Sequence, residues 1–263
     1  MTDVDMVVPQ ARSAVKAWRW VAAVLSLSQL AAPPVIDRVF GNFLETGATN
    51  DALITPAGWA FSIWGLITLL SAVTSVAVLR VGLGAPWELR ALVGASVAFA
   101  GFSTWLIIAA QDWLWLTVAV FAIMVAALVD VVRLLVRHAK DVTCPAWLRR
   151  LATLTFGLYL GWSSVAVFVN VAAALIDSGV SATGTAWQAT VLAFATGAAV
   201  ALTIALHGTA GYVAAALWAL IAAAIGAAQR GSALLAGASA AAAILIAVVA
   251  VIAHRTRNRR ART

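Results

Sequence analysis

The sequence predicts an all-α integral membrane protein with about eight transmembrane helices. Of its 263 residues, 63% are hydrophobic and only 10% are charged, whereas a soluble domain has roughly 45–50% apolar and about 25% charged residues. The apolar residues form runs near the length of about 20 residues that crosses a bilayer. Lys and Arg gather at the ends of these runs. Little sequence remains for a domain outside the membrane.

Eight apolar runs, separated by polar or helix-breaking residues, are the predicted helices. The runs cover residues 20–36, 56–79, 92–110, 113–136, 151–176, 189–206, 210–228 and 233–253. The breaks are Pro33 and Pro34, the polar segment 37–55, residues 82–86, Gln111 and Asp112, residues 138–145 and 177–185, His207 and Gly208, and residues 229–232.

Three features of the sequence support the bounds of these predicted helices. The polar segment 1–19 contains Asp3 and Asp5, unlike the short basic start of a signal peptide, so we expect the first run to be a retained helix. The third and fourth runs must be joined by a tight turn at Gln111 and Asp112. The last three runs are rich in Ala, so their bounds rest on the breaks rather than on periodicity.

The distribution of basic residues predicts the topology. The net charge is +7, from 17 Lys and Arg against 10 Asp and Glu, which in a soluble protein would suggest nucleic acid. With both termini on one side, every Lys and Arg except Arg38 and Arg230 lies on that side. This bias predicts a multi-pass protein of the inner cell membrane with both termini cytoplasmic. The basic tail, residues 254–263, is expected to contact anionic lipid, and we predict no nucleic-acid partner.

Groups suited to catalysis or metal binding are scarce in the sequence. A single cysteine, Cys144, excludes a disulfide framework or a thiolate cluster. The three histidines lie at the ends of runs and lack the spacing of metal ligands. Asp130 and Arg133 are one helical turn apart, and we expect them to pair with each other rather than to relay protons. The sequence therefore does not favour an enzyme, a metal site or a resident cofactor.

Tryptophan is the most informative residue type, with 12 copies. Seven lie near the ends of runs, where an indole ring favours the headgroup level: Trp18, Trp20, Trp87, Trp113, Trp115, Trp147 and Trp187. Five lie further into their runs: Trp59, Trp64, Trp105, Trp162 and Trp218. A buried indole N–H needs an acceptor or a ligand, so these five predict a cavity or close polar pairing.

Helical spacing places several of these rings beside small residues. The four members of each predicted face are Ala57, Phe61, Trp64 and Thr68 in the second run, Ala98, Gly101, Trp105 and Ala109 in the third, and Tyr159, Trp162, Ala166 and Asn170 in the fifth. If these faces turn inward, they form a slot lined by rings and floored by Ala and Gly, suited to a flat hydrophobic ligand. The alternative is that the rings fill a core between helices. A separate stripe of Gly58, Ser62 and Gly65 is typical of helices that approach closely.

Two sequence segments resemble the tryptophan-rich sensory protein family (TspO/MBR, relatives of the mitochondrial translocator protein). Residues 55–67, Thr-Pro-Ala-Gly-Trp-Ala-Phe-Ser-Ile-Trp-Gly-Leu-Ile, resemble the start of its second helix. Residues 158–170, Leu-Tyr-Leu-Gly-Trp-Ser-Ser-Val-Ala-Val-Phe-Val-Asn, resemble its fifth helix, with Tyr-Leu-x-Trp followed by Ala and Asn. Trp105 matches the Trp of the family's third-helix Asn-x-x-Trp, where Phe102 departs from the Asn. A double-proline signature of the first loop is reduced to Pro56 alone.

The resemblance implies a five-helix bundle at residues 20–176, with three further helices at 177–253 that suggest a longer bacterial branch. It implies a receptor or sensor that binds porphyrins or other planar hydrophobic molecules, with Trp64 and Trp162 as the two pocket tryptophans. The expected ligand-binding residues are Phe61, Trp64, Trp105, Tyr159, Trp162, Ala166 and Asn170.

Two other functions stay open. Eight helices would permit a transporter of a small hydrophobic solute, although the runs offer no mid-membrane acid for proton coupling. The other alternative is a structural membrane subunit, whose small-residue stripes would pack against a second copy in a homo-oligomer.

Overall fold

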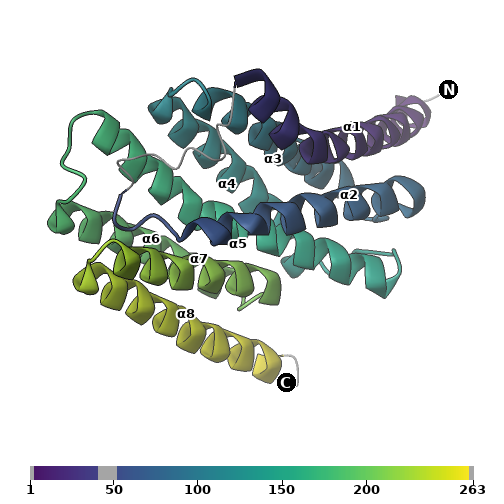
Figure 1. Cartoon of the computed structure of the whole chain (residues 1–263). Coiled ribbons are helices and arrows are strands. Elements are labelled where there is room, and N and C mark those ends of the chain that lie inside the picture. The colour runs from purple at the N-terminus through teal and green to yellow at the C-terminus, as the bar shows by residue number, and fades with distance from the viewer. Residues whose placement is uncertain (1–2, 41–51, 261–263) are drawn as a thin grey trace.

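The computed structural model describes residues 3–40 and 52–260, and the side chains of residues 13–40 and 52–256. Within these ranges the fold is a bundle of long helices without strands (Figure 1). The helices are α1 (Asp3–Phe40), α2 (Ile63–Val81), α3 (Glu88–Ala109), α4 (Leu114–Arg137), α5 (Ala146–Asp177), α6 (Thr185–Ala205), α7 (Ala210–Gln229) and α8 (Ala233–Arg260), with a short 3₁₀ helix, η1 (Gly58–Ser62), before α2. Eight helices in the described part are long and apolar enough to cross a bilayer. The predicted class of all-α, multi-pass membrane protein is confirmed.

Several helix boundaries differ from the predicted runs. The α1 helix begins at Asp3 rather than near residue 20, and α3, α5 and α6 each begin four or five residues before their predicted runs. The α1 helix continues through Pro33 and Pro34 to Phe40, because a proline removes only its own N–H donor and membrane helices tolerate that loss. The second run begins with the η1 turn, so α2 starts at Ile63. The tight turn between α3 and α4 is present, with Asp112 at a positive φ of 57°. Residues 41–51 of the predicted polar segment lie outside the described residues.

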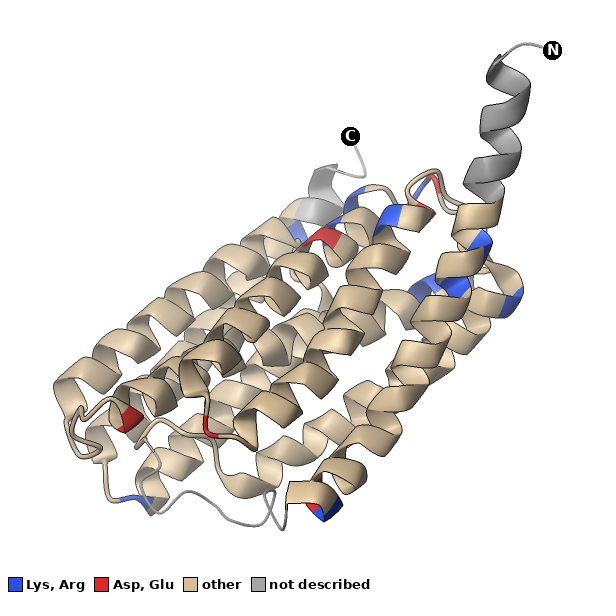
Figure 2. Ribbon diagram, turned by 90° about the horizontal axis from the view of Figure 1, so that it is seen from above, with Lys and Arg blue, Asp and Glu red and all other residues tan. Residues whose placement is uncertain are grey.

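Successive helices run antiparallel, and both ends of the bundle are distinct in charge. Figure 2 shows that α1 enters the bundle and α8 leaves it at the same end, where most of the Lys and Arg residues gather. An even number of spans produces this arrangement. The charge bias that the sequence predicts is therefore a bias between the two ends of the folded bundle.

The α5 helix lies at the centre and packs against α2, α4, α6 and α7. Glycines allow the approach of α7: a Cβ on Gly157 would lie 2.9 Å from the Tyr212 nitrogen, and a Cβ on Gly161 would overlap the Tyr212 carbonyl oxygen. On the other side, a Cβ on Gly211 would overlap the Leu154 carbonyl oxygen. Small residues at such crossings let the backbones of membrane helices meet. One hydrophobic core consequently includes residues of both α5 and α7.

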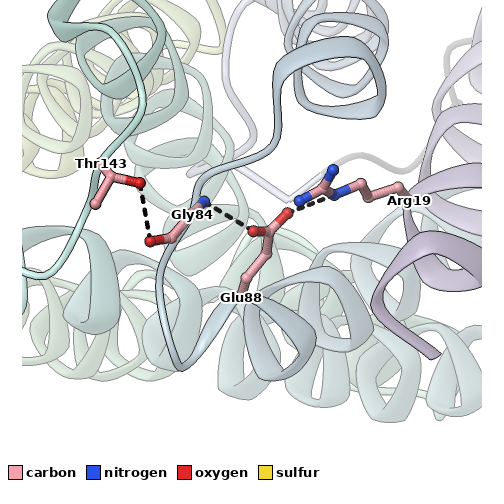
Figure 3. A network of polar contacts seen from close by, with 4 residues as sticks. All are labelled: Arg19, Gly84, Glu88 and Thr143. Atoms are coloured by element: carbon pink, nitrogen blue, oxygen red, sulfur yellow. Dashed lines mark hydrogen bonds and ion pairs between the residues drawn. The ribbon is translucent and has the colours of Figure 1, made fainter. Parts of the chain in front are cut away.

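A buried carboxylate fastens the basic end of the bundle (Figure 3). The Arg19 Nε–H of α1 donates to Glu88 Oε1 at 2.7 Å, and the Gly84 N–H donates to Glu88 Oε2 at 2.9 Å. The Thr143 hydroxyl donates to the Gly84 carbonyl at 3.1 Å. Glu88 is buried and charge-paired, so its loss would leave Arg19 without its partner. These contacts join α1 to the α2–α3 and α4–α5 connections.

The predicted pair of Asp130 and Arg133 is wrong. Asp130 instead accepts two hydrogen bonds from Arg90 of α3, at 2.7 Å from Nε and 2.6 Å from Nη2. Because α3 packs against α4, the Arg90 guanidinium reaches both carboxylate oxygens of Asp130. Such a two-bond contact is stronger than a single contact along one helix.

Candidate functional site

Three tryptophans from three helices meet between α2, α3 and α5. The ring centroids of Trp64 and Trp105 are 5.7 Å apart, and those of Trp64 and Trp162 are 6.2 Å apart. All three rings line one cavity, hereafter the aromatic cavity. Four further residues of the candidate site also lie here: Phe61, Ala166 and Asn170 line the cavity, and Tyr159 packs against Trp64 with centroids 5.7 Å apart.

The aromatic cavity is small, with a volume of about 20 Å³. That is close to the space that one water molecule occupies. The rings therefore interlock around a narrow gap rather than surround an open slot. A ligand as large as a porphyrin enters only if a ring moves.

Two phenylalanines that were not predicted as site residues pack against the tryptophans, and one of them, Phe121, also lines the cavity. The Phe102 ring is buried with its centroid 4.8 Å from that of Trp64, and the buried Phe121 ring lies 5.3 Å from Trp105. Phe102 occupies the position where the resemblance leads to an Asn. An apolar ring in place of an amide packs on Trp64 and offers no polar contact. The sequence gives little indication of the role of Phe121, because it is one of many apolar residues in α4.

Polar groups at the cavity are few and differ in how they are satisfied. The Trp105 Nε1–H donates to Asn170 Oδ1 at 3.2 Å, and Asn170 Nδ2 donates to the Ala166 carbonyl at 2.9 Å. Trp162 is only 2% exposed, and its indole N–H has no hydrogen-bond partner among the described residues. A buried donor without an acceptor costs free energy. This N–H is thus available to a ligand acceptor.

A buried polar chain supports the aromatic cluster from behind. Gln29 Nε2 of α1 donates to the Tyr159 hydroxyl at 2.7 Å, and that hydroxyl donates to the Ala98 carbonyl of α3 at 3.1 Å. Tyr159 in turn packs edge-on against Trp64. Gln29 was not predicted as a site residue; the only sign of it in the sequence is a single amide within an apolar run. The chain fixes α1, α3 and α5 around the ring.

Residues 55–61, hereafter the covering segment, form one wall of the cavity and are hydrogen-bonded to α7 and to Arg230 just after it. Three hydrogen bonds make this connection: Ala57 N–H to the Ala222 carbonyl at 3.0 Å, Trp218 Nε1–H to the Ala60 carbonyl at 3.0 Å, and Arg230 Nη1 to the Thr55 carbonyl at 2.7 Å. Pro56 and Phe61 of this segment line the cavity, as does Ala219 of α7. The α7 helix, which lies beyond the five-helix part, therefore contributes to the site, a role that the sequence did not indicate.

Several tryptophans and glycines that the sequence singled out lie outside the aromatic cavity. Trp59 and Trp218 form an edge-on pair with centroids 5.0 Å apart on the exposed side of η1. Gly101 faces Met124 of α4 instead of the cavity. A Cβ on Gly58 or Gly65 would have no neighbour within 4 Å, so no described helix of this chain packs on that stripe.

The fold and the cluster define a multi-pass helical membrane protein with an aromatic cavity between its helices. A family model described as TSPO-like protein matches residues 20–252. The chain belongs to the TSPO-like protein family, and the match runs through all eight helices. No curated protein and no solved structure matches the chain.

Proposed function

We propose that this membrane protein is a receptor or sensor that binds a planar hydrophobic ligand of the porphyrin class at the aromatic cavity. The observation that carries the proposal is the buried Trp162 N–H, which has no hydrogen-bond partner among the described residues and belongs to a ring that lines the cavity. Membership of the TSPO-like family supports it. A ligand acceptor would satisfy this donor, while flat apolar rings stack on the indoles.

Ligand entry requires the cavity to grow, and Phe61 is the wall best placed to move. Its side chain is 37% exposed, whereas Trp64 is 9% and Trp162 2% exposed. Its ring meets Trp162 edge-on with centroids 5.5 Å apart. A partly exposed ring at the end of a 3₁₀ turn rotates away at lower cost than a ring enclosed on all sides. We propose that the ligand replaces the Phe61 ring against Trp162.

The cavity wall also defines the part of the ligand that enters. Among the described residues, no Asp, Glu, Lys or Arg lines it. The inserted part is therefore uncharged, because a buried charge without a partner is costly. Any carboxylate of the ligand stays outside the ring cluster.

The proposal is tested by titrating the purified protein with protoporphyrin IX and following tryptophan fluorescence together with porphyrin absorbance. We expect saturable quenching and an absorbance shift that are lost in Trp162→Phe and weakened in Trp64→Phe. Trp147→Phe is the matched control, because this ring is 55% exposed and does not line the cavity. Equal binding by all variants refutes the site. Uptake of the porphyrin into liposomes without saturable quenching indicates the transporter instead.

We further propose that the basic end of the bundle faces the cytoplasm of a bacterial inner membrane. The support is the gathering of Lys and Arg where α1 enters and α8 leaves (Figure 2). A fluorescent protein fused to the C-terminus should fluoresce in cells, and an alkaline phosphatase fusion should be inactive. The reverse pattern contradicts this orientation.

A further inference from the structure

A second and much larger cavity lies at the basic end of the bundle. Its volume is about 550 Å³, and it is bounded by the end of α4, the start of α5, the α6–α7 connection and the end of α8. It shares no lining residue with the aromatic cavity. We name it the basic cavity.

The walls of the basic cavity are of two kinds. Leu135 and Leu154 contribute apolar surface, whereas Arg149, Arg150 and His254 contribute basic groups. In the part of the chain that the structure describes, no Asp or Glu lines it. The cavity is consequently suited to a molecule that is anionic at one part and apolar at another.

The nearby carboxylates are paired with other residues. Within the described side chains, Glu88 pairs with Arg19, Asp130 with Arg90, and Asp141 with His138. Arg149 donates from Nη1 to the Ala139 carbonyl at 3.2 Å, which orients the guanidinium without neutralising it. The two arginines thus keep their positive charge available to a bound anion.

The start of α7 adds to the positive potential. The Thr209 hydroxyl donates back to the Leu206 carbonyl at 2.6 Å, so the N-cap side chain makes no hydrogen bond to the first N–H groups of this helix. Ala210 and Gly211, the first residues of a 20-residue helix, line the cavity. The uncapped N–H groups of a helix start favour an anion.

The position of the cavity along the membrane normal fits a lipid headgroup. Trp147, one turn before Arg150 on α5, is 55% exposed, and exposed indoles favour the headgroup level. Leu154, one turn after Arg150, is 42% exposed, so an acyl chain can reach the cavity along the bundle surface. Volumes of 300–1,000 Å³ are typical of small-molecule sites.

We infer that the basic cavity binds the phosphate headgroup of an anionic phospholipid. Arg149 and Arg150 contact the phosphate, His254 and the start of α7 lie beside it, and an acyl chain follows Leu154. This binding is independent of any ligand in the aromatic cavity.

The experiment is native mass spectrometry of the full chain in detergent with added phosphatidylglycerol, phosphatidylcholine or inorganic phosphate. We expect retention of phosphatidylglycerol alone. The Arg149→Gln/Arg150→Gln variant should weaken that retention by about ten-fold, because it removes charge-assisted hydrogen bonds to the phosphate. Equal retention of phosphatidylcholine overturns the preference for an anionic lipid. If inorganic phosphate at a similar concentration displaces the lipid, the proposal of a lipid ligand is overturned. The cavity would then be a site for a free anion.

Two variants control for charge and for folding. Arg80→Gln/Arg137→Gln removes the same charge from exposed positions at the same end of the bundle, and neither residue lines the cavity. An equal loss of retention in this control overturns the proposal, because general attraction would then suffice. Arg150→Gln/His254→Gln leaves the Arg149 hydrogen bond to Ala139 intact, so it should fold normally and still lose phosphatidylglycerol. Unchanged retention in this variant also overturns the assignment.

Discussion

Replacing Phe61 with Ala should strengthen porphyrin binding rather than weaken it. The aromatic cavity holds only about 20 Å³, so the ligand must separate the Phe61 ring from Trp162, with which it forms an edge-on pair. Such pairs contribute about 0.5–1.5 kcal/mol. Without the Phe61 ring this cost disappears, and the dissociation constant should fall by about two- to twelve-fold.

The assay is the fluorescence titration with protoporphyrin IX, since Phe61→Ala leaves all 12 tryptophans in place. Phe194→Ala is a suitable control because its ring is exposed on α6 and lies outside the cavity. If the cavity were already open and Phe61 simply contacted the ligand, the variant would bind more weakly. A weaker or unchanged affinity therefore refutes the displacement of this ring.

Three further predictions address the cavity, the helix packing and the lone thiol. Ala166→Leu should weaken porphyrin binding by about ten-fold without affecting membrane insertion, because overpacking costs about 1–3 kcal/mol; unchanged affinity would place the ligand elsewhere. Gly161→Val should lower the thermal unfolding temperature in detergent, whereas Gly197→Val, whose Cβ meets open space, should not; equal shifts would contradict the close α5–α7 contact. Burial raises the pKa of the Cys144 thiol, so less thiolate is present at pH 7.5 and iodoacetamide should alkylate it more slowly than free cysteine. The rate should rise with pH through and beyond the ordinary thiol pKa, and a rate equal to that of free cysteine would be incompatible with this burial.

The helices could be predicted from the sequence because each is a nearly complete apolar run with a clear break. What the runs could not show is how a helix ends when polar and apolar signals conflict. Pro33 and Pro34 look like a break, yet α1 passes through them. Arg90 and Asp130 lie on different helices, and only the packing of α3 against α4 shows that they pair.

The converging tryptophans could also be anticipated, since their spacing puts each on a face with small residues. The size of the cavity could not, because it depends on rings from other helices. Phe102 and Phe121 occupy space that helical periodicity leaves unassigned. Gln29 reaches Tyr159 across 130 residues of sequence separation, and no local pattern predicts such a contact.

The position of the α7 helix bears on how the small aromatic cavity would open for the proposed ligand. Gly157 and Gly161 let α7 lie directly on α5, and α7 then holds the backbone before and within η1 through the Thr55, Ala57 and Ala60 hydrogen bonds. The backbone of the covering segment is fixed, so the Phe61 side chain can rotate without displacing the segment. Opening then requires the loss of one ring contact instead of the separation of two helices. A rigid support for a single movable ring would keep the indoles in position for the proposed ligand.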